Sequence, residues 1–252
     1  MRKYKHIPNL LTCINLVFGC YACIVALNGD YFGATIAILI AAGFDFADGF
    51  AARLLNAYSP IGKDLDSLAD VVSFGVAPGM MLFDFLDRTQ KMVEWGHPFA
   101  GKVFLLAAFV IPVFSALRLA IFNNDNRQTS SFIGLPVPAH ALFWASLIYV
   151  LALSVEGIAI SGFIAVKLSG ISPLFLLLIL TLVAIGSSLL LVSQIPMFSM
   201  KIKSPAWKGN EMRYTLIVAA VVFIACFGFF GITLTILLYV LINCFGFLSV
   251  KK

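Results

Sequence analysis

Charged residues are scarce in this chain: Asp, Glu, Lys and Arg make up 12% of its 252 residues, whereas hydrophobic residues make up 61%. Apolar runs recur along the chain, several with about the ~20 residues that an α-helix needs to cross a membrane. A soluble core does not require so much apolar sequence outside a periodic pattern. Open sheet edges are not tolerated in lipid, so helices are the expected spans. The composition excludes a large soluble domain and predicts an all-α fold, a polytopic membrane helix bundle.

Cysteine is rare as well, and all five cysteines lie inside apolar runs. Cys20 and Cys23 form a C-x-x-C pair, a spacing that can indicate a redox or metal site. On a membrane helix, however, we interpret them as small packing residues. The net charge of +5 could indicate a nucleic-acid partner, but the distribution of charge between the loops explains it without one.

Eight spans are expected, six in residues 1–200 and a terminal hairpin in residues 201–252, which also contain a basic loop of the same domain. The second span starts at Phe32 and carries residues 45–53 at its end, and the third has a candidate bend near Gly75–Pro78. A tight turn at Gly228–Gly231 divides the last apolar stretch, Tyr214–Val250, into two helices. The other expected spans are Leu10–Leu27, Asp64–Phe85, Val103–Phe122, Ala139–Val155 and Pro173–Val192.

The basic residues predict the orientation of these spans. With the N-terminus inside, the inner segments hold 13 of the 17 Lys and Arg residues, and the outer segments hold four: Arg88, Lys91, Lys102 and Lys167. Because Lys and Arg accumulate in cytoplasmic loops, both termini and residues 45–70 are expected on the cytoplasmic side. We therefore predict a multi-pass protein of the cell (inner) membrane, with its active site facing the cytoplasm.

Residues 45–70 hold five of the twelve acidic residues. Residues three and four apart share a helix face, and two such faces can be traced here. The second span carries Asp45, Asp48, Gly49 and Ala52 on one face, and the third carries Gly62, Asp66 and Asp70. Since a short loop joins the two helices, they are expected to be antiparallel neighbours with four carboxylates between them. Asp64 lies off this face and is expected to cap the third helix.

Four unpaired carboxylates in a membrane would cost on the order of 10 kcal/mol and would repel one another. Hard oxygen ligands of this kind suit Mg²⁺, Mn²⁺ or Ca²⁺. Two ions, for which Mg²⁺ or Mn²⁺ are the expected choice, can bind a phosphoryl group between them. Gly49 and Gly62 leave room for a diphosphate near the backbone. The planar guanidinium of Arg53 can donate paired hydrogen bonds to a phosphate. The alternative is that the aspartates are solvated at helix ends, but solvated faces do not usually place glycine between carboxylates.

The complete pattern D-x2-D-G-x2-A-R-x8-G-x3-D-x3-D runs from Asp45 to Asp70. It resembles the signature of the CDP-alcohol phosphotransferase family, membrane enzymes that move a substituted phosphate from a CDP-alcohol to an acceptor hydroxyl. The resemblance implies that Asp45 and Asp66 bridge two divalent ions, Asp48 holds one ion, and Asp70 holds the other and is the general base. It also implies contacts with the CDP-lipid from Pro8, Asn9, Thr12, Gly49, Arg53, Ser59 and Gly62.

Further segments are similar to those of the membrane-embedded phosphatidylserine synthase branch of this family. They are Ser73–Pro78, Leu117–Asn123, Phe132–Pro138 and Ser193–Ser199, with Ile121 where the branch usually has arginine. The resemblance implies transfer of a phosphatidyl group from CDP-diacylglycerol to L-serine, giving phosphatidylserine and CMP, by a homodimer in membrane lipid.

Serine is a zwitterion, so its site needs a cation for the carboxylate and an acceptor for the ammonium. Arg118 is the candidate cation, and Ser73 and Asn123 could add hydrogen bonds. The alternatives are that Arg118 snorkels to the membrane surface and that Ser73 is a small packing residue. His140 is interpreted as a hydrogen-bonded residue of the bundle and not as a base.

Two other functions stay open. Glycerol 3-phosphate or inositol phosphate could replace serine as the acceptor within the same family. A cation transporter could also use intramembrane aspartates, but it would place them near the midplane in repeated halves. The chain has no second copy of the motif, and the aspartates are expected at one membrane face.

Overall fold

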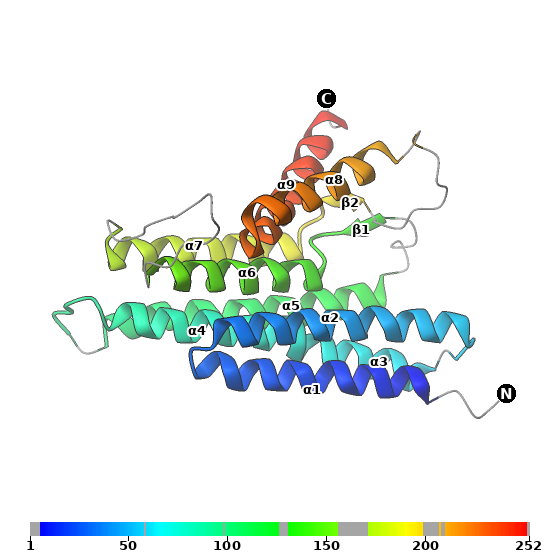
Figure 1. The fold of residues 1–252 in the computed structure, drawn as a ribbon, viewed down its shortest axis with the longest axis horizontal. Coiled ribbons are helices and arrows are strands. Elements are labelled where there is room, and N and C mark those ends of the chain that lie inside the picture. Colours follow the sequence, from blue (N-terminus) through cyan, green and yellow to red (C-terminus); the bar gives the residue numbers. More distant parts are fainter. Residues whose placement is uncertain are drawn as a thin grey trace.

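The computed structural model describes residues 6–57, 59–97, 99–125, 131–155, 171–198, 207 and 210–250. Within them the chain is almost entirely helical (Figure 1). The helices are α1 (Ile7–Leu27), α2 (Tyr31–Leu54), α3 (Pro60–Asp70), α4 (Ala77–Gln90), α5 (Leu106–Asn124), α6 (Val137–Val155), α7 (Pro173–Leu191), α8 (Glu211–Phe227) and α9 (Phe229–Val250). A π-helical turn, η2 (Val71–Val76), joins α3 to α4, a 3₁₀ turn, η3 (Gly101–Leu105), precedes α5, and two short strands are β1 (Ser131–Ile133) and β2 (Pro196–Phe198).

Six of the described helical segments are long and apolar enough to cross a membrane, which confirms the all-α membrane class. They are Ile7–Leu27, Tyr31–Leu54, Pro60–Gln90, Gly101–Asn124, Val137–Val155 and Pro173–Leu191. The terminal stretch divides into α8, with 17 residues, and α9, as predicted. The division is at Gly228, whose φ of +58° suits glycine. Figure 1 shows this hairpin inclined to the direction that α1–α7 share.

Short polar side chains set the starts of three helices. Asp30 accepts a hydrogen bond from the Gly33 amide at the start of α2, and Ser172 accepts one from the Phe175 amide at the start of α7. Ser59 caps α3, followed by Pro60 in the first turn, where a missing N–H costs nothing. The prediction that Asp64 caps this helix was wrong, because the helix begins four residues earlier. The Ser59 hydroxyl accepts a hydrogen bond from the Gly62 amide, and Pro60 provides the φ angle of the first helical turn.

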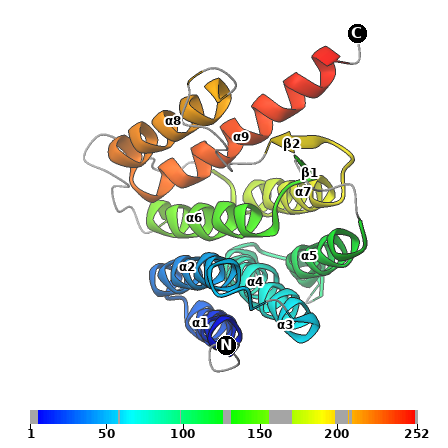
Figure 2. The ribbon, with the colours of Figure 1, turned by 90° about the vertical axis from the view of Figure 1, so that its right-hand side faces the viewer.

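The helices stack in layers when the molecule is viewed end-on (Figure 2). Helix α1 packs against α2, α3, η2 and α4, and α5 packs against α4, η2 and α7. Helices α6 and α7 lie between this group and the hairpin α8–α9. The start of α1, the α2–α3 connection and the two strands lie toward the same end of the molecule (Figure 1). Ten of the 17 basic residues counted for the topology lie outside the described residues, namely Arg2, Lys3, Lys5, Arg127, Lys167, Lys201, Lys203, Lys208, Lys251 and Lys252.

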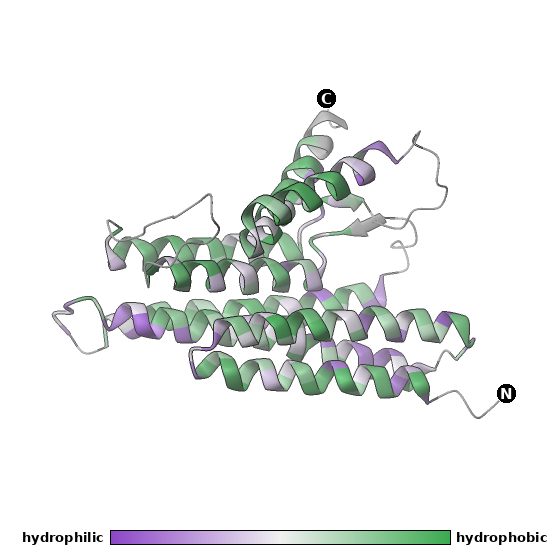
Figure 3. Cartoon of the chain, viewed as in Figure 1, coloured by the Kyte–Doolittle hydropathy of each residue, from purple (hydrophilic) through white to green (hydrophobic). Residues whose placement is uncertain are grey.

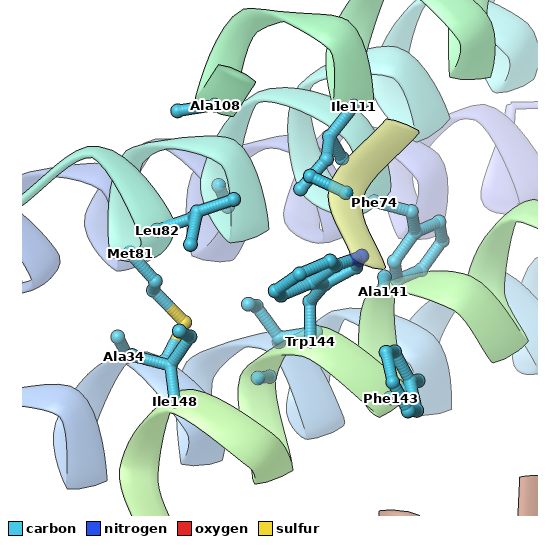
Figure 4. Close-up of a cluster of buried hydrophobic side chains, with 14 of the residues drawn as sticks. Ala34, Phe74, Met81, Leu82, Ala108, Ile111, Ala141, Phe143, Trp144 and Ile148 are labelled. Carbon is cyan, nitrogen blue, oxygen red and sulfur yellow. The ribbon is translucent and has the colours of Figure 1, made fainter. Parts of the chain in front are cut away.

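The core lies where α6 meets α2 and α4 (Figure 4). Trp144 and Phe74 are fully buried there. His140 lies one turn before Trp144, with Nε2 2.9 Å from the Ser187 hydroxyl and 3.1 Å from the Trp144 indole nitrogen. The expectation of a hydrogen-bonded histidine in the bundle is therefore confirmed. The spans consist mainly of hydrophobic residues (Figure 3), and many of their large apolar side chains are exposed, as expected for a multi-pass membrane protein.

The π-helical turn η2 follows Asp70 directly. Such turns often occur at functional sites, because the extra residue changes which side chains face a neighbouring helix. Here η2 lies against Gly19 of α1, where a Cβ atom would lie 2.8 Å from the Cα atom of Ser73. The irregularity begins at Val71, earlier than the bend expected near Gly75–Pro78. It fixes how Asp70 and Ser73 are presented to α1.

Candidate active site

Three aspartates from two helices, both of which pack against α1, have their carboxylates close together. Asp45 and Asp48 come from α2 and Asp66 from α3, and each offers an oxygen within 4.8 Å of the others. The Oδ1 atom of Asp66 is buried and has no hydrogen-bond partner. The salt bridges Asp84–Arg88 and Asp87–Lys91 lie elsewhere. A partly buried group of acceptor-only oxygens of this kind fits a divalent cation.

Asp70 lies one turn beyond Asp66 on α3. It is 7% exposed, and its carboxylate interacts electrostatically with those of Asp45, Asp48 and Asp66. Three of the four predicted carboxylates thus lie within 4.8 Å of one another, and the fourth, Asp70, is near enough to interact with them electrostatically. Since like charges repel, such a group is stable only with cations or protons between them.

Helix α1 donates neutral hydrogen bonds to two of these carboxylates. The Thr12 hydroxyl lies 2.5 Å from Oδ2 of Asp48 and 3.0 Å from the Pro8 carbonyl oxygen. The Asn15 amide Nδ2 donates to Oδ1 of Asp70 at 3.4 Å. Sequence reasoning missed Asn15, which is fully buried. The available signal was an amide in an apolar run, three residues after Thr12 on the same helix face.

A cavity of about 230 Å³ opens beside the carboxylates. All seven residues predicted to contact the CDP-lipid line it, together with Lys63, which the sequence reasoning did not select. A Cβ atom on Gly62 would lie 2.9 Å from the Ser59 hydroxyl and 3.0 Å from Oδ1 of Asn9, so only glycine allows this close approach. The lining is Pro8, Asn9, Thr12, Asp48, Gly49, Ala52, Arg53, Ala57, Ser59, Gly62, Lys63 and Asp66.

The three predicted acceptor residues have separate partners. Ser73 is fully buried and donates to the Asn15 carbonyl oxygen at 3.1 Å. The Asn123 amide donates to the Ser67 hydroxyl at 2.8 Å and ties α5 to α3. Arg118 is 6% exposed, and its guanidinium interacts electrostatically with Asp70. Of the three, only Arg118 brings a charge to the carboxylate site. Ser73 and Asn123 instead form hydrogen bonds between helices.

The sequence model of the CDP-alcohol phosphatidyltransferase family matches residues 5–169, a range that contains every carboxylate and every cavity residue described above. The chain belongs to this family. Membership makes it a multi-pass membrane transferase of phospholipid synthesis. The family depends on divalent metal, and the Asp45–Asp48–Asp66 cluster could hold such an ion in this CDP-alcohol phosphatidyltransferase.

Several curated relatives of this CDP-alcohol phosphatidyltransferase carry the name CDP-diacylglycerol–serine O-phosphatidyltransferase. The protein of Bacillus subtilis (strain 168) is 36% identical over 134 residues, 53% of this chain and 70% of that protein. The protein of Mycobacterium leprae (strain TN) is 32% identical over 233 residues, 87% of this chain and 67% of that protein. The protein of Helicobacter pylori (strain J99 / ATCC 700824) is 34% identical over 137 residues, and the match spans about half of each chain, 54% in both cases.

Proposed function

We propose that this CDP-alcohol phosphatidyltransferase transfers the phosphatidyl group of CDP-diacylglycerol to the hydroxyl of L-serine, releasing CMP. The observation that carries the proposal is the buried Arg118, 6% exposed, whose guanidinium interacts electrostatically with Asp70 beside the aspartate cluster. A base and a buried cation in one site suit an acceptor that has both a hydroxyl and a carboxylate. The names of the relatives support the same acceptor.

The cavity beside the carboxylates takes the CDP part of the donor. Arg53 and Lys63 line it and supply positive charge for the diphosphate. A Cβ atom on Gly49 would meet only the Arg53 side chain, at 3.7 Å, so the wall there stays open to a bulky group. The donor is thus bound mainly through its nucleotide and diphosphate, while its acyl chains remain in the lipid.

Asp45, Asp48, Asp66 and Asp70 would hold two divalent ions, Mg²⁺ or Mn²⁺. The buried, unpaired Oδ1 of Asp66 and the acceptor-only chemistry of the group fit such ions. When bound, the ions stabilise the negative charge that develops on the diphosphate as CMP leaves. The Thr12 hydroxyl holds the Asp48 carboxylate in its orientation through the 2.5 Å hydrogen bond.

Asp70 also acts as the general base. A serine hydroxyl does not ionise at neutral pH, so a base within hydrogen-bond reach must take its proton. Asn15 donates to one oxygen of Asp70 and leaves the other for the serine O–H. The serine oxygen then forms a bond to the phosphorus of the phosphatidyl group, and the bond from that phosphorus to the CMP oxygen breaks. Arg118 pairs with the serine carboxylate and keeps the hydroxyl directed at Asp70.

The site is proposed to face the cytoplasm at the inner membrane. The start of α1, the α2–α3 connection and the strand pair lie toward one end of the molecule (Figure 1), as the distribution of basic residues in the sequence requires. A homodimer remains part of the proposal through family resemblance.

The test is an acceptor competition with the purified full chain in lipid nanodiscs containing CDP-diacylglycerol. We expect CMP release that requires L-serine and Mg²⁺ or Mn²⁺ and that is lost in Asp70→Asn, while this variant still binds CMP. If the protein instead consumes CDP-diacylglycerol with glycerol 3-phosphate or inositol phosphate and ignores serine, the acceptor assignment is wrong.

A further inference from the structure

The terminal helix α9 completes the outer edge of strand β2. The Phe198 amide N–H donates to Oδ1 of Asn243 at 2.9 Å, and the Phe198 carbonyl oxygen accepts from the Tyr239 hydroxyl at 3.1 Å. The Asn243 amide in turn donates to the Tyr239 carbonyl oxygen at 2.7 Å, which fixes its orientation. Both side chains are buried, 6% and 7% exposed. Two side chains of α9 therefore occupy the positions that a third strand would fill.

The other edge of β2 pairs with β1, and the segments next to this pairing line a cavity at Arg118. Strand β2 pairs antiparallel with β1, with Ile133 opposite Pro196. The Gly134 amide donates to the Ile195 carbonyl oxygen at 3.0 Å, which extends the pairing by one residue. A small cavity at Arg118 is walled by Ile133 and by residues 191–194, the segment that leads from α7 into β2. The wall beside Arg118 is thus made of the same segments that β2 holds together.

Tyr239 also contacts β2 through its aromatic ring. Its ring packs edge-on against Phe198, with centroids 5.1 Å apart. A pair of three-residue strands is marginally stable by itself, and buried backbone groups need hydrogen-bond partners. The position of β2, and with it the wall at Arg118, therefore depends on α9.

We propose that Tyr239 and Asn243 are positioning residues for the acceptor. They hold β2 so that residues 191–194 and Ile133 close the space beside Arg118, and thereby determine how tightly the acceptor binds. The identity of the acceptor rests on the proposed function, but the positioning role does not. The hairpin α8–α9 lies beyond residues 5–169, so the role belongs to a part of the chain that the family match does not cover.

The test compares Tyr239→Phe, which removes only the hydroxyl, with Asn243→Leu, which removes both hydrogen bonds of that side chain. Loss of one neutral hydrogen bond should raise the KM for serine about 2- to 10-fold in Tyr239→Phe, and Asn243→Leu should raise it further. The KM for CDP-diacylglycerol and the affinity for CMP should not change. The matched control is Tyr149→Phe, whose ring packs against Phe32 and Phe229 and whose hydroxyl bonds no described residue.

An unchanged KM for serine in both variants would overturn the proposal, as would an equal loss of donor and acceptor binding, which indicates general misfolding. If the wild-type protein uses another alcohol in place of serine, the proposed function fails and the KM for that alcohol is the test of the positioning role. Amide hydrogen exchange of residues 190–198 needs no acceptor at all. It should be faster in Tyr239→Phe and not in Tyr149→Phe, and equal exchange rates in the two variants would contradict the proposal.

Discussion

Thr12→Val is a precise test of how α1 supports the carboxylate group. Valine has nearly the shape of threonine, so the substitution removes the hydroxyl and leaves the packing of α1 in place. What is lost is the 2.5 Å hydrogen bond to Oδ2 of Asp48, which is only 6% exposed. The Asp48 carboxylate would then be free to turn away from the oxygens of Asp45 and Asp66, which lie within 4.8 Å.

A hydrogen bond to a charged group contributes about 1.5–3 kcal/mol. Mutation of a side chain that orients a metal ligand typically lowers metal affinity about 10- to 100-fold. This range of affinity corresponds to the free energy of such a hydrogen bond. We therefore expect Thr12→Val to raise the concentration of Mg²⁺ or Mn²⁺ that gives half-maximal activity by about 10- to 100-fold. At saturating metal, most of the activity should return, because the carboxylate itself is still present.

The assay is CMP release from CDP-diacylglycerol with serine, measured as a function of metal concentration for the wild type, Thr12→Val and Thr12→Ser. Thr12→Ser keeps the hydroxyl and should resemble the wild type. Cys13→Val, on the exposed face of α1, controls for a valine in this helix. If Thr12→Val shows the metal dependence of the wild type, or if excess metal restores none of its activity, the hydroxyl does not orient a metal ligand.

Three further predictions follow from contacts at the same site. Asn15→Leu removes the hydrogen bond to Asp70 and should lower kcat about 10- to 100-fold without changing the KM for CDP-diacylglycerol, as steady-state kinetics can show. Arg118→Met should raise the KM for serine by about 30-fold or more, and an unchanged KM would remove Arg118 from the acceptor site. Gly19→Ala forces a methyl group against η2 and should destabilise the protein by about 1–3 kcal/mol in thermal unfolding. The control Gly43→Ala, where a Cβ atom meets nothing within 4 Å, should not.

The carboxylate group could be predicted from the sequence because helix periodicity is local and strict. Asp45 and Asp48 are three residues apart, as the same face of one helix requires, and Asp66 and Asp70 are four apart. A short connection between two spans leaves an antiparallel arrangement as the expected one. The structure adds that the oxygens of Asp45, Asp48 and Asp66 lie within 4.8 Å of one another. The roles of these residues in binding metal and moving a proton stay predictions.

The remaining contacts depend on segments that are far apart in the sequence, so periodicity does not reveal them. Asn15 meets Asp70 across 55 positions of the chain. Its motif favours Ser73 for the acceptor site, but the close approach of α1 at Gly19 makes it a donor to the Asn15 backbone. The hydrogen bond from the Tyr239 hydroxyl to β2 joins the terminal hairpin to a strand that no alternating pattern indicates.

The side chains of α1 that orient the carboxylates of Asp48 and Asp70 are neutral, and electrostatics explains why. Thr12 and Asn15 of α1 can orient Asp48 and Asp70 without adding charge. A lysine or arginine at either position would compete with divalent ions for the same oxygens, and it would bring a further charge into a buried region at high desolvation cost. The cations described at the site lie on other elements: Arg53 and Lys63 line the nucleotide cavity, and Arg118 of α5 interacts electrostatically with Asp70 from the acceptor side. The oxygens of Asp48 and Asp70 are thereby oriented without a competing cation from α1, and the positive charge for phosphate comes from Arg53 and Lys63.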